Sequence, residues 1–555
     1  MGSFSPVKMN LNCFDYSSYT MERLTPLLWA VQCGHEAVVE LLLTRGDVNP
    51  NAPDAYGRTP LLMAAYEGYE GMVKMLLARG DVDPNTRNSF GQTPLWEATA
   101  EGHERVVKML LERNDINANL ASPFGETPLY KAAHKGYVGV AKMLLERDDT
   151  NPNTANRVGS TPLLVATHWG LEGVAKMLLG RADVNPNIAD NRGETPVYRA
   201  AMEGHEGVLK ALLERADLNL NTTDISGRSP LFGAASQGHE GAVKMLLGRA
   251  DVNPNTTNIH NETPLFIAAN NGHKKIVQML LERADVNPNT ANKFNKTPLF
   301  IAVYKGHGRI VKMLLGRSDV HPNTADDEGK TALMVAAFYG AGDIVKMLLE
   351  RKDVNPDHID KEGTTPLYGA ALFGHERVVE MLLGREEVNI NATSHWGDTA
   401  LSTAARWGNK GVVKILLEQG GVNPNTADYV GQTALFKAAD WGREEVVKVL
   451  LDQSGIDPNR ATIFGNTPLS EAASGGHKGV VKMLLERVDI ISDTVDRFGE
   501  TALARAQRKG HHAIVELLSK HKNQTPQPDG GKSTALPSPG PSDPDQRPSK
   551  RNRRF

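Results

Sequence analysis

The sequence contains little cysteine: Cys13 and Cys33 are the only two thiols among its 555 residues. Two cysteines cannot cross-link a fold of this size or supply a four-thiolate metal site, which excludes a disulfide framework and fits a reducing compartment. No run approaches about 18 consecutive apolar residues, so we expect no membrane span. The amino-terminal sequence MGSFSP has no apolar signal core. We therefore expect an intracellular protein of the nucleus and/or the cytoplasm.

An excess of charge of one sign is also missing. Lys and Arg total 62 against 65 Asp and Glu, a formal net charge of −3, so no overall positive field favours nucleic-acid binding. Aromatic residues make up only 6% of the chain, whereas hydrophobic residues reach 40% and charged residues 23%. This composition is typical of a soluble folded protein and excludes disorder along the whole chain.

A 34-residue repeat runs through most of the chain. The motif T-[PA]-[LV], with serine once in place of threonine, recurs fifteen times at this single spacing. It therefore predicts one solenoid in place of the roughly three or four domains that the length suggests. With this hydroxyl residue as position 0, the repeats begin at Thr25, Thr59, Thr93, Thr127, Thr161, Thr195, Ser229, Thr263, Thr297, Thr331, Thr365, Thr399, Thr433, Thr467 and Thr501.

Each repeat predicts two helices joined by a turn. The hydroxyl at position 0 favours a helix N-cap, and proline at +1 suits the first helical position. Position +5 is Ala and position +9 is Gly in all fifteen repeats. The alanine indicates close packing, and the glycine indicates a left-handed helix end. A second amphipathic helix follows, as in ERVVKMLLER of residues 104–113.

A loop typified by D-V-N-P-N follows the second helix, and position −2 of the next repeat is glycine in twelve of fourteen cases. The two exceptions are Asn261 and Asn295, the residue type that tolerates positive φ next best after glycine. This pattern predicts a hairpin-like loop whose turn is specified by backbone geometry.

These residues resemble the ankyrin repeat, T-P-L-x-x-A-A-x-x-G-H-x-x-V-V-x-x-L-L, and residues 93–111 follow it closely as TPLWEATAEGHERVVKMLL. The chain lacks the family's usual histidine at +3, replaces the proline with alanine in four repeats, and has a period of 34 where about 33 is common. Its N-P-N loop is similar to that of fungal ankyrin arrays. The resemblance implies an all-α ankyrin-repeat solenoid of about 15 helix-turn-helix units with hairpin-like loops.

We predict three segments along the chain. Residues 1–23 form an amino-terminal extension that can cover the exposed face of the first repeat, and residues 24–520 form the repeat array. Residues 521–555 are rich in proline and serine and end in basic residues. They are too poor in apolar side chains to form a core, so we expect them to be disordered.

Motifs for catalysis and cofactors are missing. H-E-x-x-H and G-x-S-x-G do not occur, and Gly531-Lys532-Ser533 lacks the first glycine of a phosphate-binding loop because Pro526 takes its place. Nine of the 17 histidines recur at +10, where the resemblance makes them structural residues at the start of the second helix. We expect no enzymatic activity, no metal and no cofactor.

Basic residues recur at +15 (mostly Lys) and +20 (mostly Arg), and such ladders could form a stripe for nucleic acid. Solvated outer helices explain them better, because six of the lysines follow a glutamate at i−4 and the arginine sits at a helix carboxyl end. We therefore expect no direct nucleic-acid binding. The six pairs are Glu70–Lys74, Glu104–Lys108, Glu172–Lys176, Glu206–Lys210, Glu240–Lys244 and Glu444–Lys448.

Large rings gather at +7 and +8 in repeats nine to thirteen. In ankyrin arrays these positions and the loop tips line the concave recognition surface, and aromatic and arginine side chains are favoured interface anchors. With helices about 8–10 Å apart, the rings would form a stripe on the order of 40 Å long. The alternative is that they pack as core under neighbouring loops. The predicted partner-binding residues are Tyr304, Phe338, Tyr339, Leu372, Phe373, Trp396, Arg406, Trp407 and Trp441.

The resulting hypothesis is a monomeric, non-enzymatic scaffold that binds a partner protein on the concave face of the solenoid. A nuclear transcriptional coregulator is the first alternative, because a basic cluster that resembles a nuclear import signal ends the chain. A substrate adaptor for a ubiquitin ligase is the second. The residues of the import signal are Lys550, Arg551, Arg553 and Arg554.

Overall fold

Each repeat begins at the hydroxyl residue that the sequence marks as position 0. In the computed structural model, which describes residues 24–524, the side-chain oxygen of this residue accepts a hydrogen bond from the backbone N–H at +3 in all fifteen repeats. The cap satisfies one of the free N–H groups of the first turn. The four alanines at +1 start their helices at the same position as proline does, so the predicted N-cap is confirmed.

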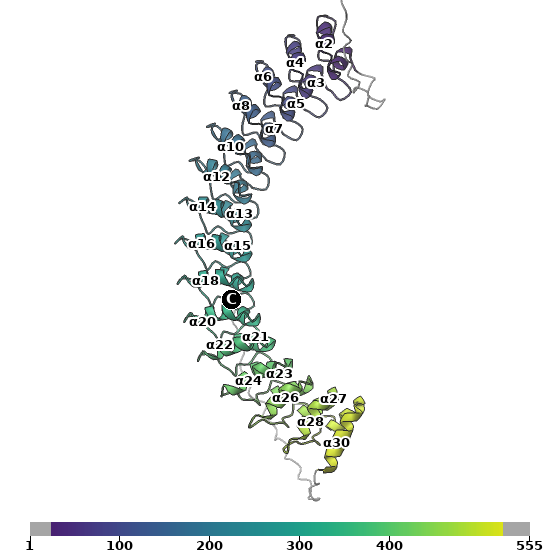
Figure 1. Ribbon diagram of the computed structural model, residues 1–555, viewed down its shortest axis with the longest axis vertical. Coiled ribbons are helices and arrows are strands. Elements are labelled where there is room, and N and C mark those ends of the chain that lie inside the picture. Colours follow the sequence, from purple (N-terminus) through teal and green to yellow (C-terminus); the bar gives the residue numbers. More distant parts are fainter. Residues whose placement is uncertain (1–23, 525–555) are drawn as a thin grey trace, which may run out of the picture. The chain divides into compact units, whose positions relative to one another are not determined.

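The described chain divides into two compact units, residues 24–370 with Arg377–Asn389, and Ala371–Glu376 with 390–524. The 34-residue register passes unchanged through this division, so the repeat pattern does not predict it. Within the first unit, first helices pack on first helices and second helices on second helices in two layers (Figure 1). Its first helices are α1 (Pro26–Gln32), α3 (Pro60–Glu67), α5 (Pro94–Glu101), α7 (Pro128–Lys135), α9 (Pro162–His168), α11 (Pro196–Met202), α13 (Pro230–Gln237), α15 (Pro264–Asn271), α17 (Pro298–Tyr304) and α19 (Ala332–Phe338).

The second helices of the first unit start one residue after the residue at +10 and form the other layer. They are α2 (Glu36–Leu43), α4 (Glu70–Leu77), α6 (Glu104–Leu111), α8 (Val138–Leu145), α10 (Glu172–Leu179), α12 (Glu206–Leu213), α14 (Glu240–Leu247), α16 (Lys274–Leu281), α18 (Gly308–Leu315) and α20 (Gly342–Leu349).

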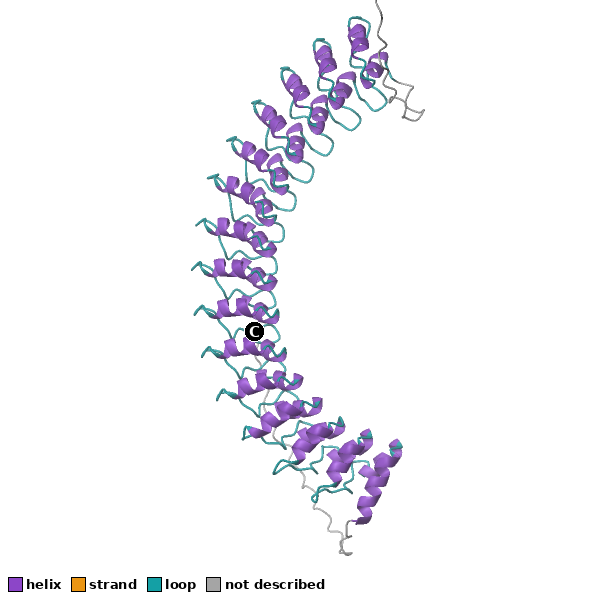
Figure 2. Cartoon of the chain, in the orientation of Figure 1, coloured by secondary structure: helices purple, strands orange, loops and turns teal. Residues whose placement is uncertain are grey.

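The second unit repeats the same pairing. Helices α21 (Pro366–Phe373) and α22 (Glu376–Leu383) contribute residues to both units. Helices and loops alternate along residues 24–524, and within that range the only strand-like pairing is an isolated bridge between Thr393 and Thr399 (Figure 2). The remaining helices are α23 (Ala400–Trp407), α24 (Lys410–Glu418), α25 (Ala434–Asp440), α26 (Glu444–Leu451), α27 (Pro468–Gly475), α28 (Lys478–Leu485), α29 (Ala502–Lys509) and α30 (His512–Gln524).

Positive φ angles occur where the repeat pattern predicts them. The glycine at +9 has positive φ in every repeat, and a methyl group on Gly68 would lie 2.7 Å from the imidazole of His103 in the next repeat. At −2, Asn261 and Asn295 adopt φ of 60° and 59°, the only non-glycine residues with positive φ among the described ones. The turn is therefore specified by backbone geometry, as predicted.

The histidines at +10 connect neighbouring repeats. His103 Nε2 lies 3.0 Å from the carbonyl oxygen of Tyr66, and His205 Nε2 lies 3.1 Å from that of His168. The same contact to the +7 carbonyl of the preceding repeat recurs at His273, His307, His477 and His511. These imidazoles satisfy carbonyl groups near the end of a first helix, which confirms their predicted structural role.

The arginines at +20 do more than the sequence predicts. Arg113 forms a bidentate ion pair with Asp115, at 2.8 and 2.6 Å, and its Nη1 also donates to the carbonyl of Leu77, the last residue of α4 in the preceding repeat. The helix dipole predicts that the arginine interacts with the end of its own helix, but the guanidinium contacts the carboxyl end of the preceding repeat's helix. Its planar fork serves the carboxylate and that carbonyl at once.

The glutamates of the outer helices follow the predicted i,i+4 pattern in part. Glu172 and Lys176 lie 2.6 Å apart as expected, but Glu240 pairs with Lys275 of the next repeat at 2.9 Å. The reason is that a residue one repeat away can lie as close to a helix surface as a residue one turn away.

An asparagine ladder runs along the loops that follow the second helices. In each rung the side-chain amide at +26 donates to a backbone carbonyl 30 residues later and accepts from a backbone N–H 32 residues later, as Asn85 does with Asp115 (2.7 Å) and Asn117 (2.8 Å). The rungs are Asn51, Asn85, Asn119, Asn153, Asn187, Asn221, Asn255, Asn289, Asn323, Asn391, Asn425 and Asn459.

Asp357 interrupts this ladder, as the only residue at +26 between Asn51 and Asn459 that is not asparagine. Its carboxylate still accepts from the backbone N–H of Asn389, but its Oδ1 is buried without a hydrogen-bond partner. At the other rungs the amide donates to the carbonyl 30 residues later, so an asparagine at 357 would donate to the carbonyl of Glu387. Burial raises the pKa of the Asp357 carboxyl, and the bond from Asn389 opposes that rise.

The end of the array differs from the predicted boundary at residue 520. Helix α30 continues to Gln524, so residues 521–524 belong to the last helix and not to the tail. His521 and Lys522 lie in the last turn, where the helix dipole favours basic side chains. The predicted extension of residues 1–23, the tail beyond residue 524 and its import signal lie outside the described residues.

We predict that Asp357→Asn stabilises the protein by about 1 kcal/mol at pH 7, because the amide restores the missing donor. The raised pKa means that wild-type Asp357 favours the folded state while it is protonated, and that this contribution is lost as pH rises through the folded-state pKa. The gain from Asn should therefore shrink towards pH 4. Urea-denaturation midpoints at the two pH values measure it.

The matched control for this ladder position is Asn323→Asp, which creates the same defect one repeat earlier and should lose a similar free energy at pH 7. Equal urea midpoints for wild type and Asp357→Asn at pH 7 would show that the missing amide donor at this rung does not lower the stability of the fold.

Candidate partner-binding surfaces

The predicted aromatic residues are exposed. Positions +3, +4, +7 and +8 of the first helices, together with the loop tips, line hollows on one face of the first unit. We call this face, and the same repeat positions of the second unit, the first-helix face. The six rings at +7 and +8 of repeats nine to thirteen have between 42% and 56% of their surface exposed. The alternative in which they pack as core is therefore wrong. These rings are Tyr304, Phe338, Tyr339, Phe373, Trp407 and Trp441.

Three of these rings form one cluster in the first unit, the tyrosine cluster of Tyr304, Phe338 and Tyr339. The Tyr339 ring meets Tyr304 edge-on at 5.9 Å between centroids and Phe338 edge-on at 5.3 Å. Edge-to-face contacts orient the rings while leaving their outer faces open to a partner. Helix ends α17 and α19 supply all three residues.

Lysines surround the tyrosine cluster. Lys296 and Lys305 each place their ammonium nitrogen 5.7 Å from the centre of the Tyr304 ring. Lys296, the three rings and the side chain of Met334 border a hollow of about 310 Å³. Asp326, Glu328, Lys330 and Asp360 also line it. The hollow therefore combines aromatic walls with charges of both signs, which suits a partner side chain of mixed character.

Two tryptophans form the centre of a cluster in the second unit. Trp407 and Trp441 stack with centroids 6.4 Å apart and an angle of 26° between their planes, and the guanidinium of Arg406 lies 5.3 Å from the Trp441 centroid. We call Arg406, Trp407 and Trp441 the tryptophan cluster. Exposed tryptophan and arginine side chains held by mutual contact are typical hot-spot residues of protein interfaces.

The remaining predicted residues are Leu372, Phe373 and Trp396. Phe373 stacks on His375 at 6.2 Å, and Leu372 is half-buried. Trp396 lies on the loop tip before α23 with 58% of its surface exposed, and no ring contact within residues 24–524 joins it to the tryptophan cluster. The described ring contacts thus group six of the nine predicted residues into the tyrosine cluster of the first unit and the tryptophan cluster of the second.

Position +4 was overlooked by the sequence analysis. It is ionisable in six repeats, and five of the six side chains make an ion pair. Lys437, for example, is only 4% exposed and lies between Asp398 and Asp428. The sequence does carry a signal for these residues: each is a charged residue within a first helix whose other residues are mostly apolar and pack against neighbouring helices. The six residues are Glu97, Lys131, Arg199, Lys437, Glu471 and Arg505.

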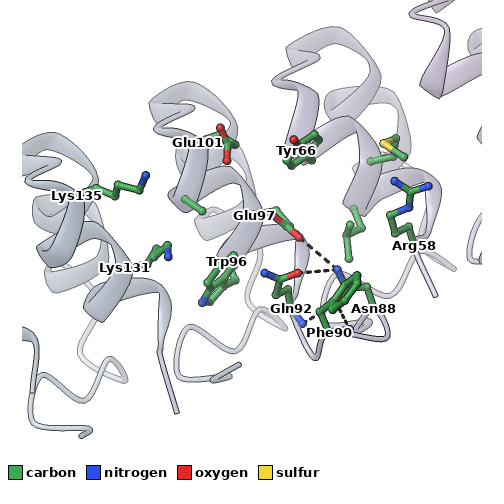
Figure 3. A pocket seen from close by; sticks show the side chains of 13 residues that line it. Arg58, Tyr66, Asn88, Phe90, Gln92, Trp96, Glu97, Glu101, Lys131 and Lys135 are labelled. Atoms are coloured by element: carbon green, nitrogen blue, oxygen red, sulfur yellow. Dashed lines mark hydrogen bonds between the residues drawn. The ribbon is translucent and has the colours of Figure 1, made fainter. Parts of the chain in front are cut away.

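Glu97 is the member of this set without an ion pair among the described residues. It is 8% exposed and borders a hollow of about 390 Å³ formed by α3, α5, α7 and two loop tips (Figure 3). Its Oε1 accepts one hydrogen bond, from Asn88 Nδ2 at 3.3 Å. Lys131, which also lines the hollow, lies 3.7 Å from Glu126 and over the Trp96 ring at 4.9 Å.

Burial raises the pKa of the Glu97 carboxyl to about 7, and the charge of Glu101 adds to the rise. Asn88, Lys131 and Arg58 act in the opposite direction. The carboxyl therefore changes charge close to neutral pH, because desolvation outweighs the nearby cations. Glu97 is thus a buried carboxyl group without a counter-ion among the described residues, and the ionised form of such a group is costly to bury.

Two further properties limit the chemistry of the described residues. Within residues 24–524, no helix combines the length and apolar character needed to cross a bilayer. The same part of the chain holds no group of three or more His, Cys, Asp or Glu side chains positioned to bind a metal ion.

We predict that Glu97→Gln gains about 1–2 kcal/mol of stability over wild type between pH 5 and pH 8.5, with solvent screening already discounted. The folded-state pKa of Glu97 is raised from 4.5 to about 7, so its protonated form stabilises the fold below pH 4.5 and that contribution is lost as pH rises through 7. Thermal denaturation across this range measures the difference. A difference that stays constant with pH would contradict the raised pKa.

Comparison with protein families agrees with the repeat register. A family model described as ankyrin repeats (3 copies) matches the overlapping segments 2–88, 49–122, 79–156, 114–190, 163–258, 231–326, 317–394, 385–462 and 455–529. A comparison with curated proteins found no match. Ankyrin repeats are in general protein–protein interaction modules, and the fold is typical of non-enzymatic scaffolds. The helix pairs, their capped 34-residue register and the family match show that this chain belongs to the ankyrin repeat family.

Proposed function

We propose that this protein is a non-enzymatic scaffold that binds a partner protein through the exposed rings of its first-helix face. The observation that carries the proposal is the tryptophan cluster, in which two stacked indoles and a guanidinium face solvent. Monomeric proteins rarely leave grouped aromatic rings exposed without a binding role. The tyrosine cluster is the corresponding surface of the first unit.

The surrounding framework prepares these surfaces for binding. Trp407 ends α23 and Trp441 caps α25, each beside a glycine with positive φ, so their backbones are held by the same helix ends that recur in every repeat. The two indole rings stack on each other and Arg406 lies against Trp441, so these contacts also restrict the side-chain rotamers. A surface ordered before it meets its partner loses less conformational entropy on binding.

A second candidate function is that of a nuclear transcriptional coregulator, which would act through the same protein contacts. The observation that favours it is the cluster of four basic residues, Lys550, Arg551, Arg553 and Arg554, at the end of the chain. A short basic cluster outside the repeats is what a nuclear import carrier recognises. The net charge of −3 favours recruitment by proteins over direct contact with DNA.

We predict that Phe373→Ala/Trp407→Ala/Trp441→Ala weakens partner binding at least about tenfold, because each truncation removes a ring of hot-spot type. Affinity purification with mass spectrometry identifies the proteins held by wild type, and titration of the purified partner then compares the two chains. Circular dichroism checks the fold, which the truncations should leave intact since all three rings are about half exposed.

The control variant is Tyr429→Ala/Phe498→Ala, which removes two even more exposed rings from loop tips of the same unit. It should bind the partner as wild type does. A partner whose affinity falls equally in both variants, or in neither, would refute a binding role for the tryptophan cluster.

We predict that deletion of residues 547–555 moves the protein from the nucleus to the cytoplasm if the coregulator function is correct. Live-cell imaging of the fluorescently tagged full chain and the deletion measures the nuclear fraction. A Lys550→Ala/Arg551→Ala/Arg553→Ala/Arg554→Ala variant should behave like the deletion. A full chain confined to the cytoplasm would rule out this function and leave the scaffold proposal standing.

A further inference from the structure

Buried charges at +4 follow a rule that Glu97 breaks. Lys131 pairs with Glu126 at 3.7 Å, and Arg505 pairs with Glu471 at 3.0 Å. Arg199 lies against Glu194, and Lys437 against two aspartates. In each case the fold supplies the opposite charge that a desolvated ion needs. Glu97 is as deeply buried, yet it receives only an amide hydrogen bond from Asn88.

The cations near Glu97 are already engaged. Arg58 pairs with Asp54 at 2.7 Å, and Lys131 is held by Glu126 and by the face of Trp96. Neither residue lies within ion-pair distance of Glu97 among the contacts of residues 24–524. The carboxylate therefore faces the hollow without a cation of its own.

The walls of the hollow are suited to the stem of a long basic side chain. Tyr66, Phe90 and Trp96 line it together with Glu97, and the rings of Tyr66 and Phe90 are exposed (Figure 3). Aromatic faces attract ammonium and guanidinium groups and cover their apolar stems. The hollow thus contains both a buried carboxylate and aromatic side chains.

The rim of the hollow carries more free negative than positive charge. Glu101, one helical turn after Glu97, is exposed at the rim, as is Lys135 of the next repeat. With Arg58 and Lys131 paired, Glu97 and Glu101 outnumber Lys135. This balance disfavours an acidic ligand, which would meet two carboxylates and leave Glu97 unmatched.

We propose that the hollow between repeats two and four receives a lysine or arginine side chain of an extended segment of a partner protein, with its cation paired to Glu97 and its stem against Tyr66 and Phe90. This inference rests on the proposed protein-binding function and adds a second site, in the first unit, with its own specificity. The cation of the bound segment would pair with Glu97, just as the other five charged residues at +4 pair with opposite charges of the protein itself.

The pairing also gives the site a sensitivity to pH. Protons compete with the ligand cation for Glu97, whose carboxyl has a pKa of about 7. The polar and charged groups that face it are Glu101, Asn88, Lys131 and Arg58. Binding should be strong at pH 8, where Glu97 is ionised, and weak at pH 6.

The experiment is a selection of random 12-residue peptides displayed on phage against the full chain at pH 8. Peptides that bind wild type but not Glu97→Gln are synthesised, and each Lys or Arg is replaced in turn by norleucine. Affinities are measured by fluorescence polarisation. We expect one basic position whose replacement weakens binding at least tenfold to wild type and leaves the weak binding to Glu97→Gln unchanged.

The matched control is Glu471→Gln, which removes a carboxylate at the same repeat position where the fold already provides Arg505. It should bind the selected peptides as wild type does. Wild type should lose about tenfold in affinity between pH 8 and pH 6, whereas Glu97→Gln should show no such loss.

Three results would overturn the proposal: peptides that bind wild type and Glu97→Gln equally, peptides that retain affinity with norleucine at every basic position, or a selection dominated by acidic peptides. If such peptides instead lose affinity with the Trp407→Ala/Trp441→Ala change, this site fails while the proposed scaffold function holds. Circular dichroism of Glu97→Gln excludes misfolding as the cause of lost binding.

Discussion

Side chains that hydrogen-bond to the backbone of the neighbouring repeat hold this structure together. In the asparagine ladder one amide satisfies a carbonyl and an N–H of the next loop, and the arginines at +20 and the histidines at +10 satisfy carbonyls at the helix ends of the preceding repeat. Loops and helix ends are where backbone groups lack partners within a repeat. A repeat of two short helices is complete only when its neighbours supply these bonds.

Because some repeat positions make the contacts between repeats, only a small set of the remaining positions on the first-helix face is free to vary in chemistry. The residues at 0, +5 and +9 build the stack and hardly change between repeats. Positions +20 and +26 are mostly Arg and Asn, and position +10 is His in nine of the fifteen repeats. Positions +4, +7 and +8 lie on the first-helix face, and there the chain places Glu97, the tyrosine cluster and the tryptophan cluster. The regular framework holds these residues at defined places, and their chemistry differs from repeat to repeat. Distinct partner segments could thus be recognised by different repeats of one chain.

The framework was largely predictable from sequence because its rules are local. A threonine before proline caps a helix wherever it occurs, and Asn261 and Asn295 adopt positive φ because their neighbours along the chain form a turn. The positions of the aromatic residues were also readable, but their exposure was not, since a ring at +8 can turn under a loop or out to solvent. Helix α30 extends beyond the predicted boundary at residue 520 because no helix-breaking residue occurs between that boundary and Pro526.

By itself, the sequence determined the helix pairs, their register, the left-handed turns and the ankyrin family, since each depends on residues within one 34-residue unit. The tertiary structure alone decided which charges are paired, where the +20 arginines point and which rings face solvent. Many of the contacts that decide these features join atoms 30 to 37 residues apart in the chain, as those of Asn85, His103 and Arg505 show. Glu97 resembles Glu471 in repeat position, and only the folded neighbours distinguish them: Arg505 lies beside Glu471, whereas an open hollow lies beside Glu97.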